Sequence, residues 1–401
     1  MKSLKVSQRA QRVIASPIRK FLPLMREAES RGTKVFRLNV GDPDFSIPPA
    51  FLKVIKNYKL QTLSYAPSPG IKEHSLAWQT YYRKFGVELP VTSILPTQGG
   101  AEAIMLALQA VADHGDEVIV FEPLYTSYKS FSVMAGVKLV PITLLIENNF
   151  ALPRASVIES KITKRTKAIV VINPDNPTGK LWTSAELKTL VNLAKKHNLF
   201  LISDETYREI RFTGRPYCIL SDKSARENLI LVDSVSKRFS IPGARIGCLA
   251  SFNQDVMVGI LKFAQARLSA GTLEQLGLVP LLKNSKPYTS KITAEYKKRQ
   301  KVVVEGLRKI KGAVFQPAQG AFYQTVKLPI KDSEAFVKFM IGEFIYKGAT
   351  VMATPMKDFY ITPGKGTQEI RIAYVLNVKD LKRAMDILAR GVEEFNKKYK
   401  V

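Results

Sequence analysis

Cysteine is scarce in this chain of 401 residues, which contains two copies, Cys218 and Cys248. Two cysteines cannot form the disulfide framework of a small secreted domain, so we expect a reducing, cytoplasmic environment. There is no apolar run of roughly 18 residues, so we expect no membrane-spanning helix. There is also no apolar segment behind the first methionine, so we expect no secretory signal. With no internal repeats either, this length is typical of a globular chain of two domains.

Acidic side chains are few relative to basic ones: 34 Asp and Glu residues face 61 Lys and Arg residues, a formal net charge of +27. A basic surface attracts nucleic acid and other polyanions. The basic residues are nevertheless spread along the chain, and their densest cluster, residues 297–301, lies in a segment predicted to be helical. No helix-turn-helix, zinc-finger or RNA-binding motif accompanies it. We therefore expect no nucleic-acid partner and interpret the charge as a field that steers small anions.

One lysine has neighbours that suit covalent chemistry. Lys237 follows an apolar strand predicted over residues 229–232, and Ser234, Ser236 and Arg245 lie close to it in the sequence. Open α/β sheets bind ligands at the carboxyl ends of their strands. Hydroxyls and a forked guanidinium can hold a phosphate, and a lysine amine can attack a carbonyl to form a Schiff base. Because Ser and Lys are common, this spacing alone gives weak support.

A glycine pair, Gly99 and Gly100, stands between a predicted strand and an apolar-periodic helix. Backbone N–H groups at the start of such a helix bind phosphate, helped by the helix dipole and by the absence of side chains. We expect Gly100 and Ala101 to be the donors. A glycine pair also occurs in ordinary turns, so its meaning depends on the other motifs.

The most specific motif is the string Asn-Pro-Asp-Asn-Pro-Thr-Gly at residues 173–179, where a strand predicted over residues 167–173 ends. Another buried strand, predicted over residues 199–203, runs into Asp204. A carboxylate in that position costs desolvation energy unless it caps a helix or faces a positive group. Both motifs therefore place polar groups at the sheet edge where Lys237 is expected.

Taken in order, these motifs resemble those of the class I and II aminotransferases, fold-type-I enzymes that use pyridoxal 5′-phosphate (PLP). The resemblance runs from about Asn39 to Val375 and is strong for bacterial enzymes labelled aspartate aminotransferase. It implies an α/β fold with a large domain, residues 46–290, whose mostly parallel mixed sheet lies between helices. Residues 1–45 and 291–401 would form a smaller α+β domain. The resemblance also implies a homodimer with active sites shared across the interface.

The resemblance assigns catalytic roles to three residues. Lys237 would carry PLP and act as acid and base, and Asp204 would keep the ring nitrogen protonated. Tyr207 would hold the phenolic oxygen together with Asn176, and Tyr125 would stack on the ring. Phosphate contacts are implied for Gly100, Ala101, Ser234, Ser236, Arg245 and, from the second subunit, Tyr65. No metal site is expected.

Substrate contacts are implied at other positions. Gly41 follows a strand predicted over residues 35–40, and its backbone would lie beside the α-carboxylate of the substrate. Arg371, in a strand predicted over residues 369–375, would grip the same carboxylate with a bidentate fork, next to Asn176. By its pattern alone, a single arginine in an edge strand is more typical of the surface.

The substrate side chain is less well defined by the sequence. Aspartate-specific relatives bind the second carboxylate with an arginine from the other subunit or with a lysine after the glycine pair, and here that position is Ala101. Arg267 lies near the region that supplies the arginine, so we consider it a candidate for this contact. The predicted reaction moves an amino group from an L-amino acid, of the aspartate and glutamate class, to a 2-oxo acid by a ping-pong mechanism.

Three alternatives stay open. The first is an aminotransferase for aromatic or small neutral amino acids, and the second is a fold-type-I C–S lyase or synthase. The third is a non-catalytic PLP-binding regulator, for whose winged-helix domain the roughly 35 residues before the first motif are too few.

The first 25 residues contain no Asp or Glu, a composition that also occurs in mitochondrial transit peptides. Residues 16–19 and a helix predicted over residues 21–29 are instead similar to the start of the family's chains. We therefore expect a folded N-terminal arm.

Overall fold

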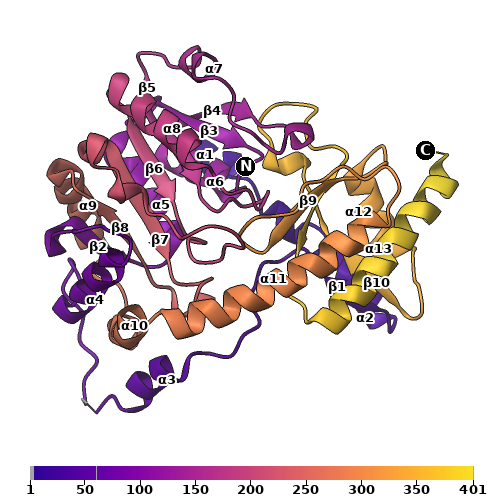
Figure 1. Cartoon of the computed structure of the whole chain (residues 1–401), viewed down its shortest axis with the longest axis horizontal. Coiled ribbons are helices and arrows are strands. Elements are labelled where there is room, and N and C mark those ends of the chain that lie inside the picture. Colours follow the sequence, from indigo (N-terminus) through magenta and orange to yellow (C-terminus); the bar gives the residue numbers. More distant parts are fainter. Residues whose placement is uncertain (1–3, 60, 401) are drawn as a thin grey trace.

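The computed structural model describes residues 4–59 and 61–400. Its largest element is a sheet of seven strands in the order β2-β8-β7-β6-β5-β3-β4 (Figure 1). The strands are β2 (Ile94–Thr97), β3 (Glu117–Glu122), β4 (Lys138–Thr143), β5 (Thr166–Ile172), β6 (Phe200–Asp204), β7 (Leu229–Ser234) and β8 (Gly247–Ser251). Neighbours are parallel, except that β8 is antiparallel to β2 and β7. The expected mostly parallel mixed sheet is confirmed.

Helices cover both faces of this sheet because side chains alternate between the faces along each strand. In β3, Val118 and Val120 belong to one hydrophobic core, whereas Ile119 and Phe121 belong to the other. The first core is completed by α5 (Gly100–Val111), α6 (Ser127–Ala135) and α9 (Gln254–Ala266). The second is completed by α3 (Pro49–Lys56), α4 (Lys72–Arg83), α7 (Ala155–Glu159), α8 (Ser184–Lys196) and α10 (Thr272–Lys283).

A smaller part of the molecule contains the remaining strands. An antiparallel sheet has the order β11-β12-β9, with β9 (Tyr323–Lys327), β11 (Thr354–Pro355) and β12 (Glu369–Ala373). A parallel pair consists of β1 (Lys34–Arg37) and β10 (Ala349–Met352). These strands share a separate core with α2 (Leu22–Ser30), α12 (Ser333–Gly342) and α13 (Val378–Tyr399). Residues 21–38 thus pack with the C-terminal third of the chain.

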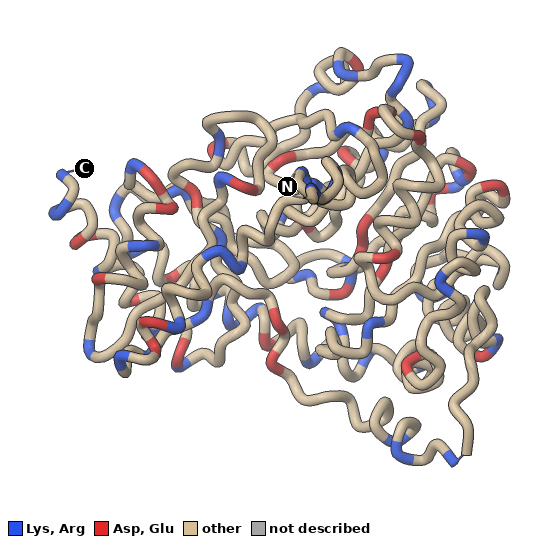
Figure 2. Tube along the Cα trace, turned by 180° about the vertical axis from the view of Figure 1, so that it is seen from behind, with Lys and Arg blue, Asp and Glu red and all other residues tan. Residues whose placement is uncertain are grey.

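The helix α11 (Lys286–Arg308) runs from α10 to the smaller part (Figure 1). The predicted domain boundary at residue 290 falls inside this helix, and the division into two domains stays a prediction. The short helix α1 (Gln8–Arg12) lies near the N-terminal end. Within the described ranges, no helix is long and apolar enough to span a membrane. Lys and Arg residues occur along the whole trace in Figure 2, as the sequence suggests.

Local sequence signals agree with most of these elements. A capping box starts α8, with Thr183 and Glu186 bonded in both directions. The strand predicted over residues 35–40 is shorter, because β1 ends at Arg37. Arg371 does not lie in an edge strand at the surface, since β12 lies between β11 and β9 and is bonded on both sides.

Candidate active site

A cavity of about 430 Å³ opens where the carboxyl ends of β5, β6 and β7 face the smaller part of the molecule. Parallel strands carry their C-terminal residues to one edge, which is why motifs distant in the sequence meet there. Twelve of the fourteen predicted site residues line it: Gly41, Gly100, Ala101, Tyr125, Asn176, Asp204, Tyr207, Ser234, Ser236, Lys237, Arg245 and Arg371.

Lys237 lies three residues beyond the end of β7. Its Nζ atom donates to the backbone carbonyl of Gly41 at 2.8 Å. Burial lowers the pKa of this lysine to about 8; nearby Asp42 opposes the shift, and the charges of Arg371 and Arg245 add to it. A substantial fraction of the amine is therefore neutral near physiological pH, as a nucleophile or a base requires.

Asp204 ends β6 and forms no ion pair with any cation in the described part of the chain. Its Oδ1 atom accepts from the backbone N–H and the hydroxyl of Thr206 at 3.1 and 2.7 Å, and the Tyr128 hydroxyl lies 3.4 Å from Oδ2. Burial raises the pKa of this carboxyl to about 6, although the Thr206 hydrogen bonds oppose the shift. A buried carboxylate without an ion pair is the setting that a cationic N–H donor on a ligand would complete.

Two tyrosines form one wall of the cavity. The hydroxyls of Tyr207 and Tyr323 lie 3.2 Å apart, and burial raises the pKa of both. A side chain at Gly41 would collide with the Tyr323 hydroxyl, so this position needs glycine. Tyr323 is not among the predicted site residues, because β9 brings it to the cavity from a distant part of the chain.

Arg371 is 1% exposed and lies on β12 across the cavity. Its guanidinium donates to Asn176 Oδ1 at 2.9 Å and to the Asn39 carbonyl at 2.7 Å, and lies 4.3 Å from the centre of the Tyr323 ring. Its Nε atom is buried and has no hydrogen-bond partner in the described structure. Burial lowers the pKa of Arg371, and among the described residues no carboxylate opposes this shift. A carboxylate ligand would satisfy both the charge and the free donor.

The opposite end of the cavity is rich in donors. Helix α5 begins at Gly100, and Gly99 before it has a φ of 80°, a conformation that favours glycine. The hydroxyls of Ser234 and Ser236 are 2.9 Å apart. The Arg245 guanidinium donates to the Gln98 carbonyl at 3.2 Å, which brings it beside the glycine pair. This cluster can bind a phosphate dianion.

The comparisons with known proteins agree with this geometry. A family profile described as "Aminotransferase class I and II" matches residues 33–388. The chain belongs to this aminotransferase family. It is an enzyme that transfers amino groups, and the family uses PLP.

Individual relatives of this aminotransferase cover nearly its whole length. An aspartate aminotransferase of Pyrococcus horikoshii is 30% identical over 92% of this chain and 94% of its own. An aromatic-amino-acid aminotransferase of Thermococcus litoralis is 28% identical over 97% and 98%. The solved aspartate aminotransferase of Thermus thermophilus with maleate has a TM-score of 0.88 and 27% identity, covering 97% of this chain and 100% of its own. The alanine aminotransferase of Pyrococcus furiosus has the same TM-score, with 29% identity and the same coverage.

Two predicted site residues of the aminotransferase lie outside the cavity of this chain. Tyr65 is 80% exposed in a loop before α4. Arg267 follows α9, and its guanidinium donates to Glu102 at 2.7 Å and to the Pro96 carbonyl at 2.8 Å. Their assignments depend on a second subunit and stay predictions.

The cavity also contains residues that the sequence analysis did not select. From the N-terminal arm come Ser16, Ile18 and Arg19, and from the larger part come Ser127 and Thr206. The arm was expected to fold, but no local pattern indicated that it would reach the site. Its proximity to Lys237 is a product of tertiary structure.

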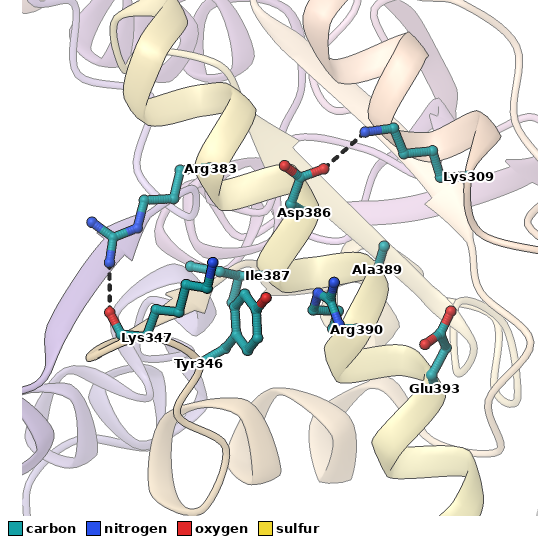
Figure 3. Close-up of a pocket in the computed structure, with 9 residues that line it drawn as sticks. All are labelled: Lys309, Tyr346, Lys347, Arg383, Asp386, Ile387, Ala389, Arg390 and Glu393. Carbon is teal, nitrogen blue, oxygen red and sulfur yellow. Dashed lines mark hydrogen bonds and ion pairs between the residues drawn. The ribbon is translucent and has the colours of Figure 1, made fainter.

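A larger hollow, of about 740 Å³, lies on the outside of the smaller part along α13, beside Tyr346 and Lys347 before β10 and Lys309 just after α11 (Figure 3). Several of its charged groups already have partners in the chain. Lys309 pairs with Asp386 at 2.8 Å, and Arg383 donates to the Lys347 carbonyl at 2.7 Å. None of the predicted site residues lines it, so we assign the chemistry to the smaller cavity.

Proposed function

We propose that the chain binds PLP in the 430 Å³ cavity, attached to Lys237, and transfers the amino group of an L-amino acid to a 2-oxo acid by a ping-pong mechanism. The preferred substrates belong to the aspartate and glutamate class. The observation that carries the proposal is the placement in one cavity of Lys237 with a lowered pKa and Asp204 without a cationic partner. The relatives named as aspartate aminotransferases support the substrate class.

The residues present fit the cofactor at both of its ends. A protonated ring nitrogen beside Asp204 would supply the missing cation at that carboxylate. Gly100, Ser234, Ser236 and Arg245 would hold the phosphate. Any side chain on Gly99 would come 2.8 Å from the Arg245 guanidinium, so the bare turn leaves the space that such an approach needs.

Each cavity residue has a task in the proposed reaction. When bound, PLP supplies a carbonyl that takes up the amino group and a ring that withdraws electrons from the substrate Cα. Arg371 binds the α-carboxylate with its guanidinium and thereby orients the Cα–H bond. The Lys237 amine, released when the substrate amine replaces it on the cofactor, would remove the Cα proton as general base and return a proton as general acid.

Four residues would tune this chemistry. Asp204 would hold a negative charge at the ring nitrogen, while Asn176 and Tyr207 would hold the phenolic oxygen. Tyr125, which lines the same cavity, would stack on the ring. The short network from Tyr207 to Tyr323 keeps both hydroxyls in place.

We further propose that the active unit is a homodimer in the cytoplasm. The exposure of Tyr65 supports this arrangement, because the loop is free to donate its hydroxyl to the phosphate in a second copy. Cys218 and Cys248 are both free and buried, which suits a reducing compartment.

A half-reaction scan tests the proposal. The PLP-loaded protein is mixed separately with each of the twenty amino acids, and conversion of the cofactor to its pyridoxamine form is followed by absorbance. We expect aspartate and glutamate to convert the cofactor fastest. With the PLP-loaded Lys237→Ala variant, no amino acid should convert the cofactor at a comparable rate. If no amino acid converts the wild-type protein, transamination is the wrong reaction.

A further inference from the structure

The N-terminal arm is tied to the site by hydrogen bonds. The Asn39 side chain donates to the Ile18 carbonyl at 3.1 Å, and the Asn39 carbonyl accepts from Arg371 at 2.7 Å. Two hydrogen bonds through Asn39 therefore connect the arm to the arginine assigned to the α-carboxylate.

Apolar contacts fix the same turn. Pro17 and Phe21, on either side of it, are buried. The Ile18 side chain packs against a small cluster that includes Phe359, whose ring centre lies 5.1 Å from the Arg371 guanidinium. Arg19 thus projects from an anchored backbone, not from a loose end.

Arg19 differs from the other cations that line the cavity. The Arg245 guanidinium makes hydrogen bonds at the phosphate end, and Arg371 is bonded to Asn176. The side chain of Arg19 is exposed and forms no ion pair or hydrogen bond with residues 4–59 or 61–400. The cavity therefore has one guanidinium beyond those needed for a phosphate and an α-carboxylate.

The charge balance of the cavity lining indicates what this guanidinium would bind. Within residues 4–59 and 61–400, its charged groups are three arginines, one lysine and a single carboxylate: Arg19, Arg245, Arg371, Lys237 and Asp204. Anions must enter to balance them, and a substrate with two carboxylates leaves fewer cations uncompensated than one with a single carboxylate.

The other candidates for a second carboxylate are less suitable. Ala101, after the glycine pair, carries no charge. Arg267 does not line the cavity of its own subunit, and Glu102 already neutralises it at 2.7 Å.

We propose that Arg19 binds the side-chain carboxylate of a dicarboxylic substrate, such as aspartate, glutamate or the matching 2-oxo acids. The inference rests on the proposed function, because it assumes that Arg371 holds the α-carboxylate. Arg19 lies on the short turn Pro17–Arg19, so the N-terminal arm becomes the element that selects the substrate. A fork-shaped guanidinium on a fixed turn can read a carboxylate without any residue from the second subunit.

The test compares Arg19→Gln with wild type as PLP-loaded enzymes. We expect the ratio of kcat/KM for aspartate to kcat/KM for alanine to fall about 10- to 100-fold, the usual weight of a hydrogen bond to a charged group. We expect Arg19→Lys to keep part of the preference, because it keeps the charge but loses the fork. Lys20→Gln is the matched control: Lys20 is the next residue but pairs with Glu334 at 2.5 Å, so the ratio should not change.

A binding measurement gives a second readout. Calorimetric titration of the loaded proteins with maleate, a dicarboxylate without an amino group, should show a dissociation constant about 10- to 100-fold weaker for Arg19→Gln. Equal losses for aspartate and alanine, or unchanged maleate binding, would overturn the inference. A wild-type enzyme that converts no amino acid would instead overturn the proposed function, so the two failures are distinguishable.

Discussion

Two neighbouring regions of this aminotransferase handle buried charge in opposite ways. Beside the cavity, a network pairs each buried cation with a carboxylate: Arg208 donates to Glu205 at 2.6 Å and to Asp233 at 2.7 Å, and Arg238 pairs with Asp233. In the cavity itself, Asp204 faces no cation, and Arg371 faces no carboxylate within the described structure.

The pKa shifts separate the two regions. Burial lowers the pKa of Arg208, but the charges of Asp233 and Glu205 outweigh it and raise the pKa overall. Burial also lowers the pKa of Arg371, and there nothing reverses the shift. We conclude that buried charges paired within the chain stabilise the fold. Equally buried charges without a partner in the chain are available to bind a ligand.

The largest expected effect concerns the cavity. Lys237→Ala removes the attachment point and the general base together, so the transamination rate should fall by at least about 10²- to 10⁴-fold. Steady-state assays measure the loss, and circular dichroism checks that the fold is retained. A variant with near wild-type activity would show that another group does this work.

The next effect concerns the network. Asp233→Asn leaves Arg208 and Arg238 short of a buried counter-charge, so the free energy of unfolding of the apoprotein should drop by about 3–5 kcal/mol in urea titrations. Asp204→Asn is the matched control from the cavity. It removes a carboxylate without an ion pair, so it should leave the apoprotein at least as stable at pH 7.5.

The control also has a predicted pH dependence. The pKa of Asp204 is raised to about 6 in the folded state, so at pH 4–6 this carboxyl binds more protons in the folded chain than in the unfolded chain. The contribution of Asp204 to the free energy of unfolding therefore declines as pH rises through this window. The Asp204→Asn variant should lack this decline. If both substitutions destabilise equally, the distinction between the two regions is wrong.

A smaller effect is expected on the titration of Lys237. Attachment to PLP needs the neutral amine, so the rate of cofactor capture by the apoprotein should rise with pH around a midpoint near 8. Arg371→Gln removes a charge that lowers this pKa and should move the midpoint up. Arg390→Gln, in the hollow of Figure 3, should leave it in place. A midpoint unaffected by Arg371→Gln would contradict the electrostatic coupling.

The smallest effect is expected for Arg267. Because Glu102 already neutralises it, Arg267→Ala should change the preference for aspartate over alanine by less than about three-fold, which is less than for Arg19→Gln. Half-reaction rates with both amino acids measure the ratio. A ten-fold loss would restore Arg267 as the residue that reads the side chain from the second subunit.

Many features of the fold and of the cavity follow from local sequence patterns. Apolar runs followed by polar motifs predicted the strands, and the rule that ligands bind at strand ends predicted that Lys237, Asp204 and Asn176 would meet. The conformational needs of the glycine pair predicted the turn before α5. Such features depend on residues close together in the chain.

The remaining features depend on contacts between distant segments. The pairing of Arg208 with Asp233 joins the segment after β6 to the end of β7, and neither residue has a local signal for it. Tyr323 enters the cavity from the other part of the molecule, and Arg19 reaches it because Ile18 is bonded to Asn39. The position of Arg371 in a central strand likewise required the sheet order.

The most direct test of the central claim is reduction of the PLP-loaded protein with borohydride, followed by mass spectrometry of its peptides. We expect one stable pyridoxyl group, carried by the Lys237 side chain. A label on a different lysine, or no label on a protein that remains folded, would contradict it.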